Sequence, residues 1–117
     1  MGFETFIPRK MVIGKPMVTI LPVGVFWVNP ATTTKYFKGF KRTFLLYDRE
    51  RRVVGLKPTN EEKHTLSVSR SKARNSTTVA GRGFLEYFKI LPKERKSYEA
   101  TWNSKEEVVE VDLNNPL

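Results

Sequence analysis

The sequence predicts a mostly β protein with two short helices, of the α+β class: a small pseudo-twofold β-barrel built from two strand–strand–helix–hairpin repeats. Two observations predict this fold. A hairpin pattern occurs at residues 45–58 and returns at 101–113, each time with an aromatic residue, Asp or Asn, a charged turn and a Val-rich strand. One unit with so few strands cannot bury both faces of its sheet, whereas two units can close a barrel around one core.

Matched residues at constant spacing support the repeat. A spacing of 55 relates Tyr47, Val53 and Val54 to Trp102, Val108 and Val109. A spacing of 51 relates Val28, Tyr36, Phe37 and Lys38 to Val79, Tyr87, Phe88 and Lys89. The change of spacing falls in a predicted loop, where insertions are tolerated. We therefore expect one domain over residues 1–117, with internal repeats at approximately 15–58 and 64–113. A chance coincidence of apolar residues is the alternative.

Local signals define the elements of the first unit. Residues 17–21 and 25–28 are rich in β-branched and aromatic side chains and are predicted as strands. Asn29 is a good N-cap and Pro30 suits the first helical position, so a helix is expected from residue 31 to about residue 38. Its run of three threonines has poor helix propensity, and tertiary packing must hold it.

The hairpins are predicted from turn chemistry and from alternation. Asp48 and Asn103 each open a charged turn, where a side-chain oxygen can accept hydrogen bonds from backbone N–H groups ahead of it. Alternate apolar residues of the flanking strands are expected to face the core. They are Leu45, Tyr47, Val54 and Leu56 in the first hairpin and Tyr98, Ala100, Trp102, Val109, Val111 and Leu113 in the second.

The second unit is expected to follow a polar connector at residues 58–63. Residues 65–69 and 77–79 are predicted strands, joined by a basic loop at residues 70–76. The helix near residues 81–89 begins with two glycines and again depends on packing. An apolar arm at residues 3–8 has no assigned structure.

The net charge of +9 indicates a polyanionic partner, because such a surface attracts polyanions and speeds their encounter. The charge is uneven: residues 1–59 hold 11 Lys and Arg against 3 acids, whereas residues 60–117 hold 10 against 9. A coat of mixed charges, as in thermophilic proteins, is the alternative. Such a coat would leave the two signs more nearly balanced.

Composition argues against catalysis. The absence of Cys excludes disulfides, thiolate catalysis and cysteine-rich zinc sites. His64 is the only His, so it has no imidazole or thiol partner for a metal site or a nucleophile–base pair. We therefore expect no enzyme, no cofactor and no metal. No apolar run is long enough to span a membrane and the N-terminus does not match a signal peptide, so a cytoplasmic protein is expected.

Four segments of the first unit together resemble the AbrB-like transition-state-regulator unit. They are Gly24-Val25-Phe26-Trp27-Val28-Asn29-Pro30, a short helix ending Lys35-Tyr36-Phe37, Phe44-Leu45-Leu46-Tyr47-Asp48, and Val53-Val54-Gly55-Leu56-Lys57-Pro58. The resemblance covers residues 24–58 and, more loosely, 77–113, which implies a tandem arrangement similar to that of MraZ proteins. It implies a swapped-hairpin or looped-hinge β-barrel that binds DNA and regulates transcription, through basic residues near the loop before the helix and on adjoining strands.

The predicted nucleic-acid-binding residues form two groups. One lies in the basic loop and at the start of the second helix: Arg70, Lys72, Arg74 and Arg82. The other surrounds the end of the first helix and comprises Lys35, Lys38, Lys41 and Arg42, with Arg49, Arg51 and Arg52 in the nearby hairpin turn. Such cations suit phosphates, although a basic loop that is simply solvated is the alternative.

Three functions are consistent with these features. The favoured one is an AbrB-like DNA-binding regulator or architectural protein. The second is an RNA- or ribonucleoprotein-binding protein that uses the same basic surface. The third is a non-catalytic protein–protein interaction module with exposed aromatics such as Phe3, Phe6 and Phe40. Phe26 and Trp27 are expected in the core rather than as stacking platforms for bases. Because both repeats lie in one chain, the barrel could close within a monomer, with a homodimer as the alternative.

Overall fold

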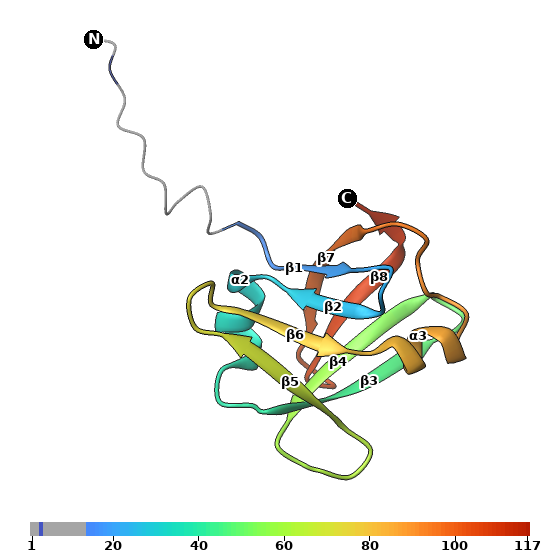
Figure 1. Ribbon diagram of the computed structural model, residues 1–117, viewed down its shortest axis with the longest axis horizontal. Coiled ribbons are helices and arrows are strands. Elements are labelled where there is room, and N and C mark those ends of the chain that lie inside the picture. The colour runs from blue at the N-terminus through green and yellow to red at the C-terminus, as the bar shows by residue number, and fades with distance from the viewer. Residues whose placement is uncertain (1–2, 4–13) are drawn as a thin grey trace.

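The computed structural model describes residue 3 and residues 14–117, and its eight strands form a closed antiparallel β-barrel (Figure 1). The strands are β1 (Met17–Ile20), β2 (Val25–Val28), β3 (Arg42–Asp48), β4 (Val53–Thr59), β5 (Leu66–Ser71), β6 (Ser76–Ala80), β7 (Lys96–Asn103) and β8 (Val108–Pro116). Two short helical segments accompany them: α2 (Pro30–Thr32), which continues into η1 (Thr33–Phe37), and α3 (Arg82–Tyr87). This confirms the mostly β class with two short helices. The predicted apolar arm, Phe6 included, lies outside the described residues except for Phe3.

The strand order around the barrel is β1-β2-β6-β5-β3-β4-β8-β7, which closes on β1. The element order strand–strand–helix–strand–strand occurs twice along the described part of the chain. The first hairpin of each half is bonded to the second hairpin of the other half, because β1 pairs with β7 and β5 pairs with β3. If each strand of the first half is swapped with its counterpart in the second half, β1 with β5 and so on to β4 with β8, every strand keeps an equivalent pair of neighbours. The topology therefore has two-fold pseudosymmetry. That the halves are repeats of one ancestral unit stays a prediction.

Left-handed backbone conformations also recur at matching places in the two halves. Gly24 and Asn75, the residues just before β2 and β6, have φ of 92° and 51°. Arg52 and Glu107, just before β4 and β8, have φ of 56° and 57°. Such values are uncommon for residues other than Gly. Matching hairpin turns of the two halves therefore both end in a residue of positive φ.

The predicted turn chemistry is confirmed in both charged hairpins. Asp48 Oδ1 accepts hydrogen bonds from the backbone N–H groups of Glu50 and Arg51, at 3.0 and 3.1 Å. Asn103 Oδ1 accepts from the backbone N–H groups of Lys105 and Glu106, both at 3.1 Å. These bonds satisfy donors that the tight turn would otherwise leave to solvent.

The core consists of the inward-facing alternate residues of the strands, with Phe37 and Leu85 from the helical segments. The largest fully buried side chains include Ile20, Phe26, Phe37, Leu56 and Leu85. The core prediction for Trp27 is wrong: because Phe26 and Val28 on either side of it point inward, Trp27 points outward and is half-buried.

The first helical segment begins as predicted. Asn29 is its N-cap, and its side-chain oxygen accepts from the backbone N–H of Thr32 at 3.0 Å. From Thr33 onward the segment is π-helical, which the sequence did not predict. Two of its three threonines are buried with their hydroxyls bonded, which explains how residues of poor helix propensity are accommodated. Tyr36 stacks on Trp102 at 4.6 Å between ring centroids and fastens the segment to β7.

Candidate functional site

The structure brings most of the predicted nucleic-acid-binding residues to one end of the barrel. Figure 1 shows the turn between β5 and β6 beside α2 and η1. Asn75 of that turn donates from Nδ2 to Thr34 Oγ1 at 2.8 Å, and Arg70 donates from Nη2 to the Phe37 carbonyl at 2.6 Å. We call this region the cationic end. Its basic residues are Lys35, Lys38, Lys41, Arg42, Arg70, Lys72 and Arg74.

A buried contact fixes the two parts of the cationic end to each other. Thr33 of η1 and Thr77 of β6 are 2 % and 0 % exposed, and their hydroxyl oxygens are 3.0 Å apart. The Thr33 hydroxyl also lies 3.2 Å from the Val28 carbonyl. Both side chains are therefore hydrogen-bonded where water is excluded, and the basic residues above them are held on a rigid base.

Two of the arginines have structural partners. Arg42 donates from Nε to Thr65 Oγ1 at 2.6 Å, from Nη1 to Ser67 Oγ at 3.0 Å and from Nη2 to the Thr65 carbonyl at 3.0 Å. It ties β3 to the start of β5. Arg70 lies in β5 rather than in a loop, and its Nη2 bonds the Phe37 and Phe40 carbonyls at the end of η1. A cation at this position stabilises a helix C-terminus.

The other five cations have no such partners. Within the described part of the chain, the side chains of Lys35, Lys38, Lys41, Lys72 and Arg74 form no ion pair or hydrogen bond. All five are exposed. The segments that build the cationic end, residues 14–47 and 63–85, contain no Asp or Glu. Their positive charges are thus not neutralised by ion pairs, and they face solvent.

Arg82 lies apart from the cationic end. It follows β6, whose five residues run away from the β5–β6 turn and span roughly 13 Å. The backbone N–H of Gly81 donates to the Gly24 carbonyl at 2.8 Å, which places the start of α3 against the β1–β2 turn. The Arg82 Nε also forms an ion pair with Glu86 at 3.2 Å. Arg82 therefore does not join the other members of its predicted group.

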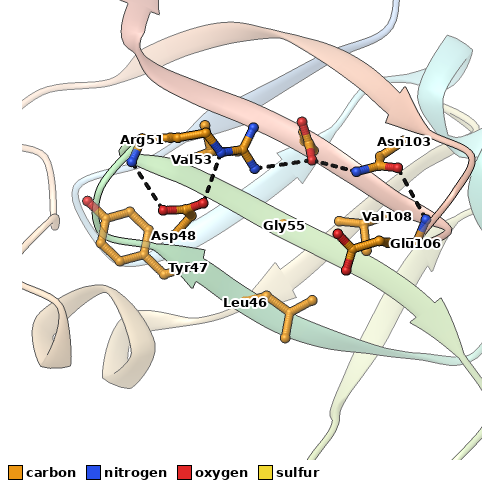
Figure 2. A pocket seen from close by; sticks show the side chains of 10 residues that line it. Leu46, Tyr47, Asp48, Arg51, Val53, Gly55, Asn103, Glu106 and Val108 are labelled. Carbon is orange, nitrogen blue, oxygen red and sulfur yellow. Dashed lines mark hydrogen bonds and ion pairs between the residues drawn. The ribbon is translucent and has the colours of Figure 1, made fainter.

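Of the three arginines of the first charged hairpin, Arg51 lines a separate groove. This groove, of about 280 Å³, lies along β4 between the two charged turns (Figure 2). Asp48 Oδ2 lies 2.9 Å from Arg51 Nε, and Glu110 Oε2 lies 3.6 Å from Arg51 Nη2 and 3.0 Å from Asn103 Nδ2. The hydrogen bond from Arg51 lowers the pKa of Asp48, and the same contact raises the pKa of Arg51.

This polar network bonds its members to one another in an exposed setting. The Arg51 and Asp48 side chains are 59 % and 41 % exposed. Their interaction is screened by water and contributes modestly to holding the two turns together. Arg49, on the same turn, has its Cζ 5.0 Å from the centroid of the Phe88 ring. Arg49 and Arg51 are thus engaged with this hairpin and its neighbours rather than with the cationic end.

Few residues suggest other chemistry. His64 is exposed in the connector and has φ of 65°. In residues 14–117 and Phe3 there is no group of three or more His, Cys, Asp or Glu placed to hold a metal ion. None of the described helices is long and apolar enough to cross a membrane.

Sequence reasoning missed the pocket at the rim of the cationic end. It has a volume of about 240 Å³ and is lined by Gly39, Phe40, Lys41, Val68 and Arg70. The sequence predicts Phe40 as a residue that packs on the first helix or as an exposed aromatic for protein contacts. Its place in one pocket with Lys41 and Arg70 depends on β5 folding back along the end of η1. The available signal was an aromatic residue inside a basic run, Lys38-Gly39-Phe40-Lys41-Arg42.

Comparisons of the chain with protein-family models, with curated proteins and with solved structures find no match.

Proposed function

We propose that this protein binds nucleic acid through the cationic end, and that it acts as a non-catalytic, AbrB-like DNA-binding regulator or architectural protein in the cytoplasm. The observation that supports this most directly is the set of five exposed, unpaired cations on a hydrogen-bonded base. Lys and Arg side chains of this kind neutralise phosphates and release condensed counterions, which provides most of the affinity of non-specific binding.

The strand topology supports the AbrB-like part of the proposal. The resemblance implies a barrel in which hairpins are exchanged between two similar units. In this chain β1 pairs with β7 and β5 pairs with β3, so each half contributes its first hairpin to the other. Because one chain closes the whole barrel, we expect it to work as a monomer. DNA is favoured over RNA because the resemblance is to DNA-binding proteins; phosphate contacts alone serve both.

The salt dependence of binding tests the proposal. We compare the wild type with a variant in which four cationic-end residues become Ala: Lys35, Lys38, Lys72 and Arg74. A control variant changes four exposed cations elsewhere to Ala: Lys93, Arg95, Lys96 and Lys105. Both variants lose the same charge. Fluorescence anisotropy with a labelled DNA oligonucleotide, single-stranded or duplex, gives the dissociation constant at several salt concentrations.

For the wild type we expect log K to fall steeply with log salt. The cationic-end variant should lose up to roughly 3 to 4 units of that slope, since each lost phosphate contact removes about 0.7 to 0.9. The control should keep nearly all of it. A wild-type slope near zero would refute nucleic-acid binding, and equal losses in the two variants would refute this location. RNA of equal length binding more tightly than DNA would contradict the choice of DNA.

A further inference from the structure

Two residues with flat side-chain groups line the pocket beside Phe40. The Phe40 side chain is 37 % exposed, and Arg70, whose guanidinium group is planar, lines the same pocket. Val68 adds an apolar surface and Lys41 a positive charge. Nucleobases stack on aromatic rings and on arginine guanidinium planes. The pocket thus combines stacking surfaces with a cation that suits the phosphate of the same nucleotide.

Hydrogen bonds fix the backbone on which Phe40 sits. Asn60 accepts from the Lys41 backbone N–H at 2.9 Å and donates from Nδ2 to the Gly39 carbonyl at 3.1 Å. The Lys41 carbonyl accepts from the Val68 backbone N–H at 3.0 Å. Residues on both sides of Phe40 are therefore restrained, although this segment is an exposed connection between η1 and β3.

The Arg70 wall is restrained as well. Its Nη2 donates to the Phe37 carbonyl at 2.6 Å and to the Phe40 carbonyl at 3.3 Å. Both bonds come from one nitrogen at the edge of the guanidinium group, and Arg70 is exposed. A site whose walls are already ordered loses less entropy when a ligand binds.

We propose that this pocket holds one unstacked base of DNA, so that the preferred partner contains a single-stranded segment rather than a continuous duplex. The inference rests on the proposed function, because the cations of the cationic end must hold the adjacent phosphates. In a continuous duplex the faces of the bases are covered by their neighbours, and a base reaches such a pocket only after unstacking. Single-stranded DNA exposes those faces at little cost.

Substitution of Phe40 tests the pocket. Phe40→Leu keeps an apolar side chain but removes the flat ring, and Phe40→Trp keeps a flat ring. Tyr87→Leu is the control, because Tyr87 is an exposed aromatic at 73 % on α3, away from the pocket. Each protein is titrated with a single-stranded oligonucleotide and with the duplex of the same sequence. Circular dichroism and thermal melting confirm that each variant is folded.

We expect the wild type to bind the single strand more tightly than the duplex. Phe40→Leu should weaken single-strand binding by about 5- to 150-fold, the range found when a stacking aromatic is removed. Duplex binding should change little. Phe40→Trp should bind the single strand like the wild type, and its added indole should be quenched by the bound base. Tyr87→Leu should match the wild type.

Two results would overturn the inference, and they differ from failure of the proposed function. In the first, the wild type binds in a salt-dependent way, but Phe40→Leu loses the same affinity for the single strand as for the duplex. That result would show that no base occupies this pocket, and it would leave phosphate binding intact. Tighter binding to the duplex would do the same. If the wild type shows no salt-dependent binding, the proposed function itself is refuted.

Discussion

Asn29 should be the most sensitive polar position in the first half of the barrel. It is 6 % exposed, and its amide makes four hydrogen bonds. Its Oδ1 accepts from the backbone N–H groups of Met17 and Thr32 and from the Thr32 hydroxyl, at 3.0, 3.0 and 2.7 Å. Its Nδ2 donates to the Lys15 carbonyl at 2.9 Å. Asn29→Ala removes all four and leaves buried groups without partners.

The loss can be estimated from two contributions. Removal of an N-cap costs about 1 kcal/mol. A part-buried backbone N–H left unsatisfied at Met17, together with the hydrogen bond that the Thr32 hydroxyl loses while it keeps the Met17 carbonyl as partner, adds roughly 2 to 4 kcal/mol. The total of roughly 3 to 5 kcal/mol is a large part of the stability of a domain this size. We expect thermal denaturation, followed by circular dichroism, to show a melting temperature lowered by roughly 12 to 20 °C.

Two further variants separate the contributions. Asn29→Ser keeps an N-cap oxygen but is too short to reach both Met17 and Lys15. Its melting temperature should therefore lie between those of Asn29→Ala and the wild type. Asn103→Ala removes a similar side chain from an exposed turn, where water replaces the lost bonds, and should cost about 1 kcal/mol or less. Equal melting temperatures for Asn29→Ala and Asn103→Ala would refute this account of Asn29.

Three other predictions concern packing, pH and assembly. Gly55→Ala should cost about 1 to 3 kcal/mol in chemical denaturation, because its Cβ would lie 2.7 Å from Val108 Cγ1; unchanged stability would mean that Val108 moves aside freely. Asp48 has its pKa lowered chiefly by the Arg51 hydrogen bond, so its stabilisation is present above about pH 3.9 and is lost as the pH falls through the folded-state pKa. Asp48→Asn should therefore be less stable than the wild type at pH 7 and should converge with it in strong acid. Light scattering should give the mass of one chain, 13.6 kDa, whereas a dimer mass would contradict closure of the working unit in a monomer.

The features predicted correctly from the sequence depend on local chemistry. Asp48 and Asn103 bond backbone groups two and three residues away, and Asn29 caps the helix that begins at the next residue. Period-two alternation also identified Val54 and Leu56 as core. Such signals are contained in short segments, and they are sufficient to define strands, turns and the class of fold.

The features that were missed depend on contacts between distant segments. Most members of the two predicted groups of cations share one end of the barrel because Asn75 bonds Thr34 and Arg70 bonds the Phe37 carbonyl, across 41 and 33 positions of sequence. Arg82 and the turn arginines lie elsewhere. The sequence also could not show that Arg42 and Arg70 have structural partners, since a charge does not specify what satisfies it. Alternation predicts Trp102 in the core, yet it is 38 % exposed because it lies near the end of β7, where it stacks on Tyr36.

The two ends of the barrel occupy corresponding places in the topology but differ in chemistry. At one end the β5–β6 turn, with Lys72 and Arg74, lies beside η1. At the other the β1–β2 turn lies beside α3, and exposed Val23 and Tyr87 stand out there, at 63 % and 73 %. In a dimer of identical chains both ends would be the same by symmetry. Because both halves belong to one polypeptide, each end is free to differ. One chain therefore offers a single cationic end, and a two-fold symmetric DNA site would require two chains.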